Sequence, residues 1–225
     1  MSILIPTLVS RRVLCARISS QLQAQIASCR CEAEVELLQL EDAGEQTTGA
    51  KRNALVSRAR GRFVAFVDDD DEVSCDYVKR VVDRLRSRPG IDCIGFRGTI
   101  FFRGRHPREF THSIRYKDYC SKGGTYYRPP YHLNPMRRDI AIRYPFADVS
   151  YSEDIDFAMR LQRDGVLREE EFIDSILYYY YSRRSYAWQV LLDRTEPMRH
   201  RFGLRAANRL RLLPVAMDRR PDAPA

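Results

Sequence analysis

The sequence predicts an α/β protein with a largely parallel central sheet and helices on both faces. Four apolar, β-rich runs lie at residues 2–6, 34–40, 63–67 and 91–96. Between them lie three stretches with helical features, at residues 10–28, 48–58 and 74–87. Strands and helices in this alternating order form parallel sheets, because each helix carries the chain back across one face. Two of the runs end in acidic residues, and open α/β sheets bind ligands at the carboxyl ends of their strands.

Local signals set the expected bounds of the helices. Thr47 or Thr48 is expected to cap the helix that runs to Arg58, which Gly61 follows. Ser74 is expected to cap the helix that ends near Ser87. Ser152 is expected to cap a further helix over residues 153–162. The second half of the chain has a different composition, and residues 97–144 are rich in Arg, Lys, Tyr, Gly and Pro.

Further elements are expected in this second half and at the end of the chain. We expect a short strand over residues 99–102, a hairpin through Gly104, and a late strand over residues 172–181. The stretch from Tyr186 to Leu213 is expected to be helical.

Composition indicates one large domain, or a domain with a helical tail. The 225 residues include 38 Lys and Arg against 30 Asp and Glu, a net charge of +8, which suggests a polyanionic partner or an anionic surface. The six cysteines lack metal-binding spacing, and no signal peptide or apolar run of membrane-spanning length is present. We therefore expect reduced thiols, a cytoplasmic protein and no transmembrane segment.

The most informative stretch is a buried strand that ends in acidic residues. Phe63 to Val67 is followed by four consecutive aspartates, Asp68 to Asp71. Carboxylates packed so closely repel one another unless a positive charge lies among them. A hard divalent cation, Mg²⁺ or Mn²⁺, suits such oxygen ligands. The alternative interpretation is a solvated acidic turn before the next helix.

The order of motifs resembles inverting glycosyltransferases of the GT-A fold, in particular glycosyltransferase family two, over residues 2–182. The resemblance depends on five segments in the family's order: Ser2-Ile-Leu-Ile-Pro-Thr7, Leu40-Glu-Asp-Ala-Gly44, Gly49-Ala-Lys-Arg-Asn53, the run from Ala59 to Glu72, and Ser152-Glu-Asp-Ile-Asp-Phe-Ala-Met-Arg-Leu161. It implies a Rossmann-like sheet with residues 1–96 as the nucleotide-sugar-binding half and residues 97–182 as the acceptor-binding half. Residues 183–225 would be a basic helical tail.

The resemblance implies a donor site for a nucleotide-diphosphate sugar, with a UDP-sugar favoured. The implied donor-binding residues are Thr7, Asp42, Lys51, Arg52, Asn53, Asp68 and Asp69. Asp70 would bind the metal, which bridges the diphosphate and assists its departure as a Lewis acid. Any of these residues alone would more often be a turn residue or a surface charge. The four consecutive acids also leave the register of the metal ligand open by one residue.

The resemblance also implies a general base on the opposite side of the site. Asp154 would take the proton of the acceptor hydroxyl, with Glu153 as its orienting neighbour, and a single displacement would invert the anomeric configuration. The alternative is that Glu153 and Asp154 only stabilise the start of a helix. His132, Asn134 and Arg138 match a segment that lines the acceptor side in the family.

The acceptor is suggested only by composition. Basic residues, with tyrosines interleaved, fill residues 97–144, and basic residues recur after residue 182. Such a segment suits a nucleic acid, and a hydroxymethylated base in DNA is a chemically sensible acceptor. A cell-surface polysaccharide or a lipid-linked glycan at an anionic membrane is an alternative acceptor. A non-catalytic nucleic-acid-binding module is the alternative of another class.

Overall fold

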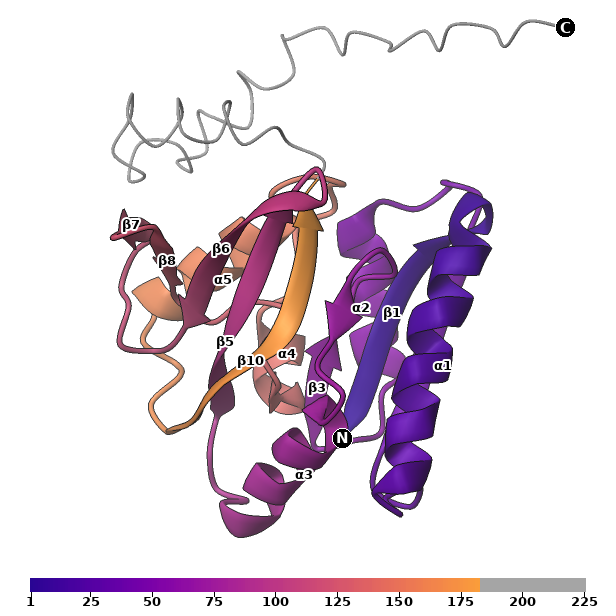
Figure 1. Cartoon of the computed structure of the whole chain (residues 1–225), viewed down its shortest axis with the longest axis horizontal. Helices are drawn as coiled ribbons and strands as arrows, with labels where there is room; N and C mark the ends of the chain where they lie inside the picture. Colours follow the sequence, from indigo (N-terminus) through magenta and orange to yellow (C-terminus); the bar gives the residue numbers. More distant parts are fainter. Residues whose placement is uncertain (183–225) are drawn as a thin grey trace, which may run out of the picture.

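A computed structural model describes residues 1–182 as a mixed sheet of ten strands with helices on both of its faces. The first half contains the strands β1 (Ser2–Leu8), β2 (Glu36–Asp42), β3 (Phe63–Phe66) and β4 (Glu72–Val73). Its helices are η1 (Val9–Arg11), α1 (Arg12–Ser28), α2 (Thr48–Arg58) and α3 (Tyr77–Ser87). The predicted fold class is confirmed (Figure 1).

The second half adds antiparallel hairpins and two more helices. Its strands are β5 (Cys93–Phe102), β6 (Arg105–His112), β7 (Cys120–Lys122), β8 (Thr125–Arg128), β9 (Met136–Arg137) and β10 (Glu170–Ser182). Its helices are α4 (Arg138–Arg143) and α5 (Glu153–Arg163). The predicted tail, residues 183–225, and the helix expected from Tyr186 to Leu213 lie outside the described residues.

Strand pairing brings the carboxyl ends of the main strands to one edge of the sheet. The order is β2-β1-β3-β9-β5-β6-β8-β7, and β10 pairs with β4 and β5. β1 is parallel to β2 and β3, whereas the short β9 is antiparallel to both β3 and β5. β5 therefore runs in the direction of β3, and β10 is parallel to β5. The strands β1, β3, β5 and β10 consequently all point toward the upper side of Figure 1.

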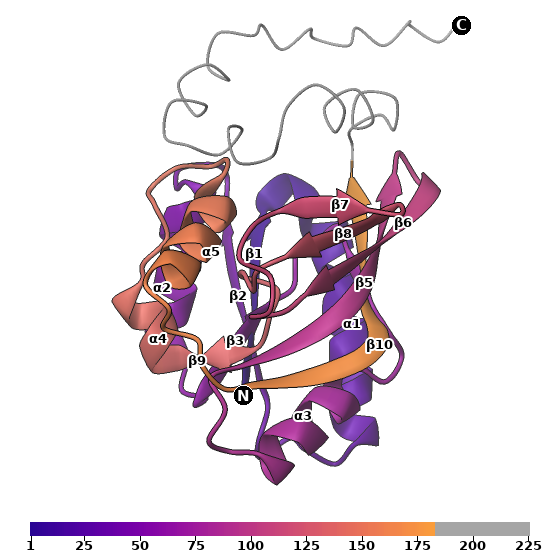
Figure 2. The ribbon, with the colours of Figure 1, turned by 90° about the vertical axis from the view of Figure 1, so that its left-hand side faces the viewer.

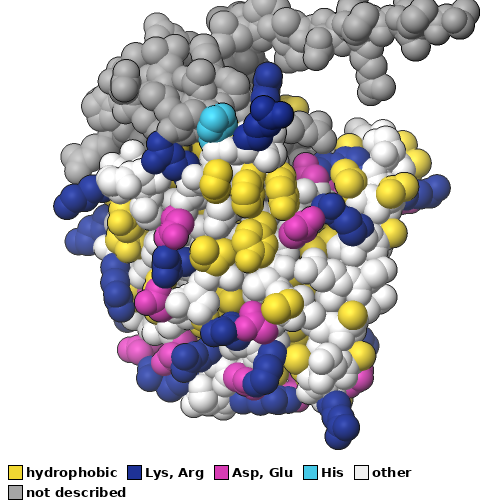
Figure 3. Space-filling view, viewed as in Figure 1, with side chains coloured by type: hydrophobic (Ala, Val, Ile, Leu, Met, Phe, Trp, Pro, Cys, Tyr) yellow, Lys and Arg dark blue, Asp and Glu magenta, His cyan; other side chains and the backbone are white. Residues whose placement is uncertain are grey.

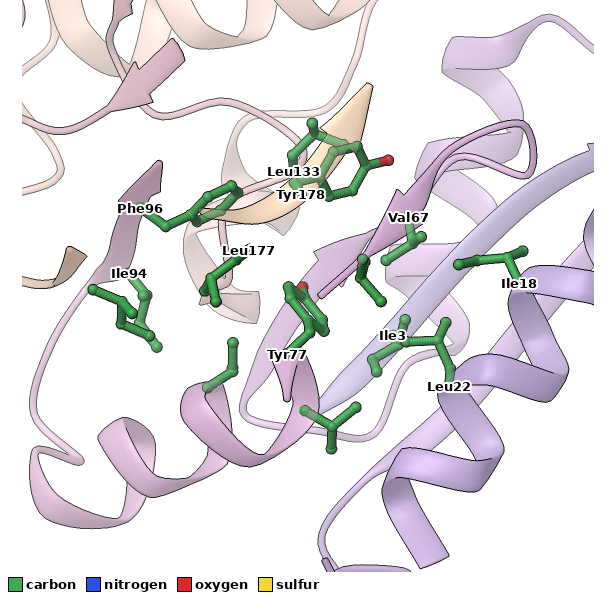
Figure 4. Close-up of a cluster of buried hydrophobic side chains, with 14 of the residues drawn as sticks. Ile3, Ile18, Leu22, Val67, Tyr77, Ile94, Phe96, Leu133, Leu177 and Tyr178 are labelled. Atoms are coloured by element: carbon green, nitrogen blue, oxygen red, sulfur yellow. The ribbon is translucent and has the colours of Figure 1, made fainter. Parts of the chain in front are cut away.

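The alternation of side chains along β1 gives the sheet two buried faces. Ile3 and Ile5 pack in one cluster with residues of α1 and α3, among them Ile18 and Leu22 (Figure 4). Leu4, between them, packs in a second cluster with residues of α2, α4 and α5. Figure 2 shows these three helices together on their side of the sheet. Because both faces are covered, the strand is apolar from Ile3 to Pro6, as parallel strands usually are.

Three local predictions differ from the structure. The strands expected at 91–96 and 99–102 are a single strand, β5, because it pairs with β6 and β10 on both sides of Gly98. Ser74 does not cap α3, which begins at Tyr77, and Ser152 has a φ of 66° and no capping hydrogen bond. The predicted cap at Thr47 is confirmed by the hydrogen bond that its side chain accepts from the amide of Ala50. No helix within residues 1–182 is long and apolar enough to cross a membrane.

Candidate active site

The four aspartates that follow β3 alternate between the interior and the open edge of the sheet. Asp69 and Asp71 are buried, with exposed fractions of 1% and 0%. The side chains of Asp68 and Asp70 are 25% and 30% exposed. The alternation gives the acidic run two inward carboxylates and two that a ligand can reach.

The inward carboxylates hold the loop in place. Asp71 accepts hydrogen bonds from the hydroxyl of Tyr178 (2.9 Å) and the amide of Tyr181 (2.9 Å). The hydroxyl of Tyr178 also accepts a bond from the amide of Asp68 (3.0 Å). Burial, together with the charge of Asp68, raises the pKa of Asp71 well above its ordinary value. β10 is thus the element that fixes the loop after β3.

Asp69 connects the acidic run to the end of β1. It accepts a hydrogen bond from the hydroxyl of Thr7 (2.6 Å) and forms an ion pair with Arg11 (2.5 Å). Burial raises the pKa of Asp69, although Thr7 and Arg11 oppose this shift. The predicted donor residues Thr7 and Asp69 are therefore in direct contact, on adjacent parallel strands.

Arg52 joins the acidic run to the first turn of α5. Its side chain is 4% exposed, with Nη2 3.0 Å from Asp68 Oδ1 and Nε 3.2 Å from Glu153 Oε1. The guanidinium lies 4.9 Å from the ring centre of Phe66, a cation–π contact. Burial alone would raise the pKa of Asp68, but Arg52 and His132 lower it well below its usual range. Burial raises the pKa of Glu153, against the effect of Arg52.

His132 makes a second connection between the same two elements. Its Nε2 is 3.4 Å from Asp68 Oδ2, and its Nδ1 is 3.7 Å from Asp154 Oδ2. The imidazole is buried, and within the described residues Nδ1 has no hydrogen-bond partner. Asp154 itself is 26% exposed and accepts a bond from the amide of Ile155 (2.9 Å). The carboxylate of Asp154 therefore faces the site with a buried imidazole beside it.

Lys51 and Asp42 form the far end of the site. The ammonium of Lys51, which is buried, contacts Asp42 (2.7 Å) and the carbonyl oxygen of Thr7 (3.0 Å). Asp42 also accepts bonds from the amides of Gly44 and Gln46. Burial acts to raise the pKa of Asp42, but these bonds lower it overall. Asp42 is thus held as a carboxylate at the end of β2.

Three predicted site residues do not join this cluster. The amide of Asn53 bonds both to the carbonyl and to the amide of Phe146, which ties α2 to the loop before α5. Asn134 is fully buried and bonds to the carbonyl of Ile94 and the amide of Tyr131. Arg138 bonds to the carbonyls that end α2, and its amide bonds to Arg62 at the start of β3. Arg138 therefore lies at the opposite end of β3 from Asp68.

Two residues in the site were missed by the sequence analysis. Tyr178 belongs to the unusual run of four tyrosines in the late strand, and that run was the only signal for it. Arg11 had no signal, because nothing in the sequence connects residue 11 to residues 69 and 70. Of the tyrosines interleaved with basic residues over 97–144, Tyr119, Tyr126 and Tyr131 belong to the core and offer no surface to a nucleic acid.

The side chains that could bind a metal suit a hard divalent cation only in part. Within residues 1–182 no three His, Cys, Asp or Glu side chains converge on one point. Asp70 offers a partly exposed carboxylate, which is the ligand type that Mg²⁺ and Mn²⁺ prefer. The chemistry of Asp70 therefore fits a metal that takes its remaining oxygen ligands from a diphosphate and water.

The fold and the acidic site define a protein of the GT-A class. The sequence model described as Glycosyl transferase family 2 matches residues 41–145, which include the acidic run and Arg52. The predicted resemblance to family two glycosyltransferases of the GT-A fold is therefore confirmed. A search among curated proteins found no match to the sequence.

Solved structures of S. aureus TarS share this fold. TarS 1-349 in complex with UDP is 16% identical, with a TM-score of 0.55 over 80% of this chain and 60% of that one. The complex of TarS 1-349 with UDP-GlcNAc is 17% identical, with a TM-score of 0.56 over 82% of this chain and 59% of that one. The chain thus spans about 60% of the length of these TarS structures.

Proposed function

We propose that the chain transfers a sugar from a UDP-sugar to an acceptor hydroxyl, with inversion at the anomeric carbon. The observation that carries this proposal is that two side chains each connect Asp68, on the donor side, to the acidic first turn of α5. Arg52 contacts both Asp68 and Glu153, and His132 lies between Asp68 and Asp154. A protein that only bound a nucleotide would have no need of a second acidic group so closely tied to the first.

The donor side is formed by residues at the ends of β1, β2 and β3. Thr7, Asp42 and Lys51 meet the nucleoside, and Asp68 lies toward the ribose and the sugar. Asp69, predicted to share that contact, is buried and acts through its bonds to Thr7 and Arg11. Two of the TarS structures hold UDP and UDP-GlcNAc, which supports a UDP-sugar as the donor. The cations Lys51 and Arg52 lie near the amino end of α2, where positive charge favours a diphosphate.

Mn²⁺ or Mg²⁺ is the proposed cofactor, held by Asp70. Such an ion supplies Lewis-acid assistance to the departing nucleoside diphosphate. Arg11, Arg52 and Lys51 also lie along this edge, and their positive charge would favour the diphosphate.

Asp154 is the proposed general base. It lies on the first turn of α5, where the exposed amides stabilise a carboxylate, and it is open enough to reach an acceptor. It receives the proton of the acceptor hydroxyl as that oxygen attacks the anomeric carbon and the bond to the diphosphate breaks. Because attack comes from the side opposite the leaving group, the configuration inverts. Glu153, buried and paired with Arg52, positions this turn.

A hydroxymethylated base in DNA is the proposed acceptor. Five exposed cations, none of which forms an ion pair within the described part of the chain, lie on and between the hairpins of the acceptor half: Arg103, Arg105, Arg115, Lys117 and Lys122. Figure 3 shows basic and acidic side chains mixed over much of this face, with basic side chains and a histidine at its upper edge. Tyr151, next to the first turn of α5, is 88% exposed and offers a ring on which a base can stack.

The test is an incubation of the full chain with Mn²⁺, a panel of nucleotide sugars and DNA with or without hydroxymethylcytosine. Mass analysis of the digested nucleosides should show a glycosylated hydroxymethylcytosine with one donor and no adduct on plain DNA. Asp154→Asn should lower the rate by about 10²–10⁴-fold while UDP still binds, since a general base contributes that much. Asp70→Ala should abolish the metal dependence together with most of the activity.

Each other outcome has a distinct meaning. Donor hydrolysis, or transfer to a polysaccharide or a lipid-linked glycan, without an adduct on DNA would remove the DNA acceptor and keep the transferase. Retained DNA binding with no transfer and no hydrolysis for any donor would favour a non-catalytic nucleic-acid-binding module. Full transfer by Asp154→Asn would remove that residue as the base.

A further inference from the structure

Arg11 holds the carboxylate that the metal would use. Its Nη2 lies 2.5 Å from Asp69 Oδ1 and 2.5 Å from Asp70 Oδ2, so one guanidinium nitrogen bridges the two acids. Arg11 ends η1, the short turn that follows the carboxyl end of β1. The residue thus reaches the acidic run from a neighbouring strand end.

The charge that the acidic run requires is already present in the protein. Arg52 is paired with Asp68, Arg11 with Asp69 and Asp70, and Arg17 with Glu72. Repulsion among the carboxylates, from which the sequence analysis expected a metal, is therefore relieved in part by arginines. Of these arginines, Arg11 is the one whose partner is the proposed metal ligand.

We propose that Arg11 and a divalent cation are alternative partners of Asp70. The idea rests on the proposed function, because it assumes that Asp70 is the metal ligand. Two cations cannot contact the same carboxylate oxygen without strong repulsion, so the metal enters as Arg11 withdraws. Arg11 acts as a positioning residue that keeps the empty site ordered and makes metal binding alone weak.

The surroundings of Arg11 permit this exchange. Its side chain is 26% exposed, so a path to solvent is open. Within the described residues its Nε has no hydrogen-bond partner, so Nε gives up no bond when the guanidinium withdraws from the two ion pairs. Once displaced, the guanidinium lies beside the place of the diphosphate, whose oxygens accept bonds from arginine well. Arg52, in contrast, is buried, and its withdrawal would leave the carboxylates of Asp68 and Glu153 without their cation.

The test measures Mn²⁺ binding to the full chain without nucleotide, by titration calorimetry or by the electron paramagnetic resonance of free Mn²⁺. Arg11→Gln removes the competing charge, and we expect Mn²⁺ to bind about tenfold more tightly than to the wild type. Arg17→Gln is the matched control, because Arg17 is paired with Glu72 at 3.1 Å beside the same acidic run. That control should change the affinity by no more than about twofold.

Arg11→Lys provides a second variant should Arg11→Gln fail to fold. A lysine keeps the charge on a shorter side chain that should reach the two acids less well, so its Mn²⁺ affinity should lie between the other two. Circular dichroism and thermal unfolding check that each variant is folded.

Three results would overturn the proposal. They are an unchanged or weaker Mn²⁺ affinity in Arg11→Gln, an equal gain in Arg17→Gln, and no Mn²⁺ binding by Arg11→Gln. None of these measurements uses sugar transfer. Tighter Mn²⁺ binding in a protein that transfers no sugar would therefore overturn the proposed function alone.

Discussion

Replacement of Arg52 by methionine should remove much of the stability of the domain. Methionine keeps an apolar stem that can pack on Phe66, but it leaves the carboxylates of Asp68 and Glu153 without their cation. The side chains of Arg52 and Glu153 are 4% and 6% exposed, so water can solvate the unpaired carboxylate of Glu153 only poorly. Removal of one partner from a buried ion pair costs about 3–5 kcal/mol. A domain has about 5–15 kcal/mol in total, so the loss should be plain.

Urea unfolding followed by far-ultraviolet circular dichroism measures this loss as a change in the free energy of unfolding. Arg60→Met is the matched control, because Arg60 is paired with Glu36 at 3.1 Å but is 86% exposed. Loss of such a surface pair should cost less than about 1 kcal/mol. Arg52→Lys should cost an intermediate amount, because one ammonium cannot contact Asp68 and Glu153 as the guanidinium does.

The effect of Arg52→Met should also depend on pH in a defined direction. The pKa of Asp68 is lowered in the folded protein, so its ion pair stabilises the fold above the unfolded pKa of about 3.9 and is lost as the pH falls through the folded value. The gap in stability between the wild type and Arg52→Met should therefore be widest near neutral pH and narrow in acid.

A second measurement separates the bridging role of Arg52 from simple packing. In the double variant Arg52→Met/Glu153→Gln, one of the two uncompensated charges is removed. The double variant should consequently be more stable than Arg52→Met alone, and the coupling energy should be about 1 kcal/mol or more. A free energy of unfolding for Arg52→Met within 1 kcal/mol of the wild type, or equal to that of Arg60→Met, would refute the reasoning.

Two further predictions concern the loops that frame the site. Because burial raises the pKa of Asp71, the native state should lose stability as the pH rises above about 4. Asp71→Asn carries no charge, so its Tm should exceed that of the wild type by about 2–4 °C at pH 8 and by less at pH 5; an equal difference at both pH values would contradict this. A Cβ at Gly49 would lie 1.8 Å from the carbonyl oxygen of Ala147, so Gly49→Ala should cost about 1–3 kcal/mol and weaken UDP binding. Gly90→Ala, where a Cβ meets nothing within 4 Å, should change stability by less than about 0.5 kcal/mol and leave UDP binding unchanged.

Features that depend on neighbouring residues could be predicted from the sequence. The alternation of apolar runs with helical stretches placed β1, β2, β3 and the helices between them. The position of Asp68 directly after a buried run placed the acids at the carboxyl end of β3. The motifs of the family added the partnership between this end and the first turn of α5. In the first two cases the signal lies next to the feature that it predicts, whereas the last needed the motifs of the family.

Contacts between distant parts of the chain could not be predicted in this way. Thr7 and Asp69 are 62 residues apart, Arg52 and Glu153 are 101 apart, and Tyr178 and Asp71 are 107 apart. The partner of each charge depends on strand order and register, which single residues do not reveal. Acceptor-side roles were expected of Asn134 and Arg138 only because they match a segment of the family. In the structure their side chains donate hydrogen bonds to backbone carbonyls instead.

The register of the acidic run shows how the two kinds of information combine. Four consecutive aspartates are chemically equivalent in the sequence, so spacing alone could not select the residues that face a ligand. The four acids lie in a turn after β3, in which the amide of Asp71 donates to the carbonyl of Asp68 (3.2 Å), and the partners contributed by β1 and β10 fix which pair points inward. Asp69 and Asp71 are bonded to Thr7 and Tyr178, which leaves Asp68 and Asp70 on the open side. The buried partners therefore decide which two of the four acids in this turn face a ligand.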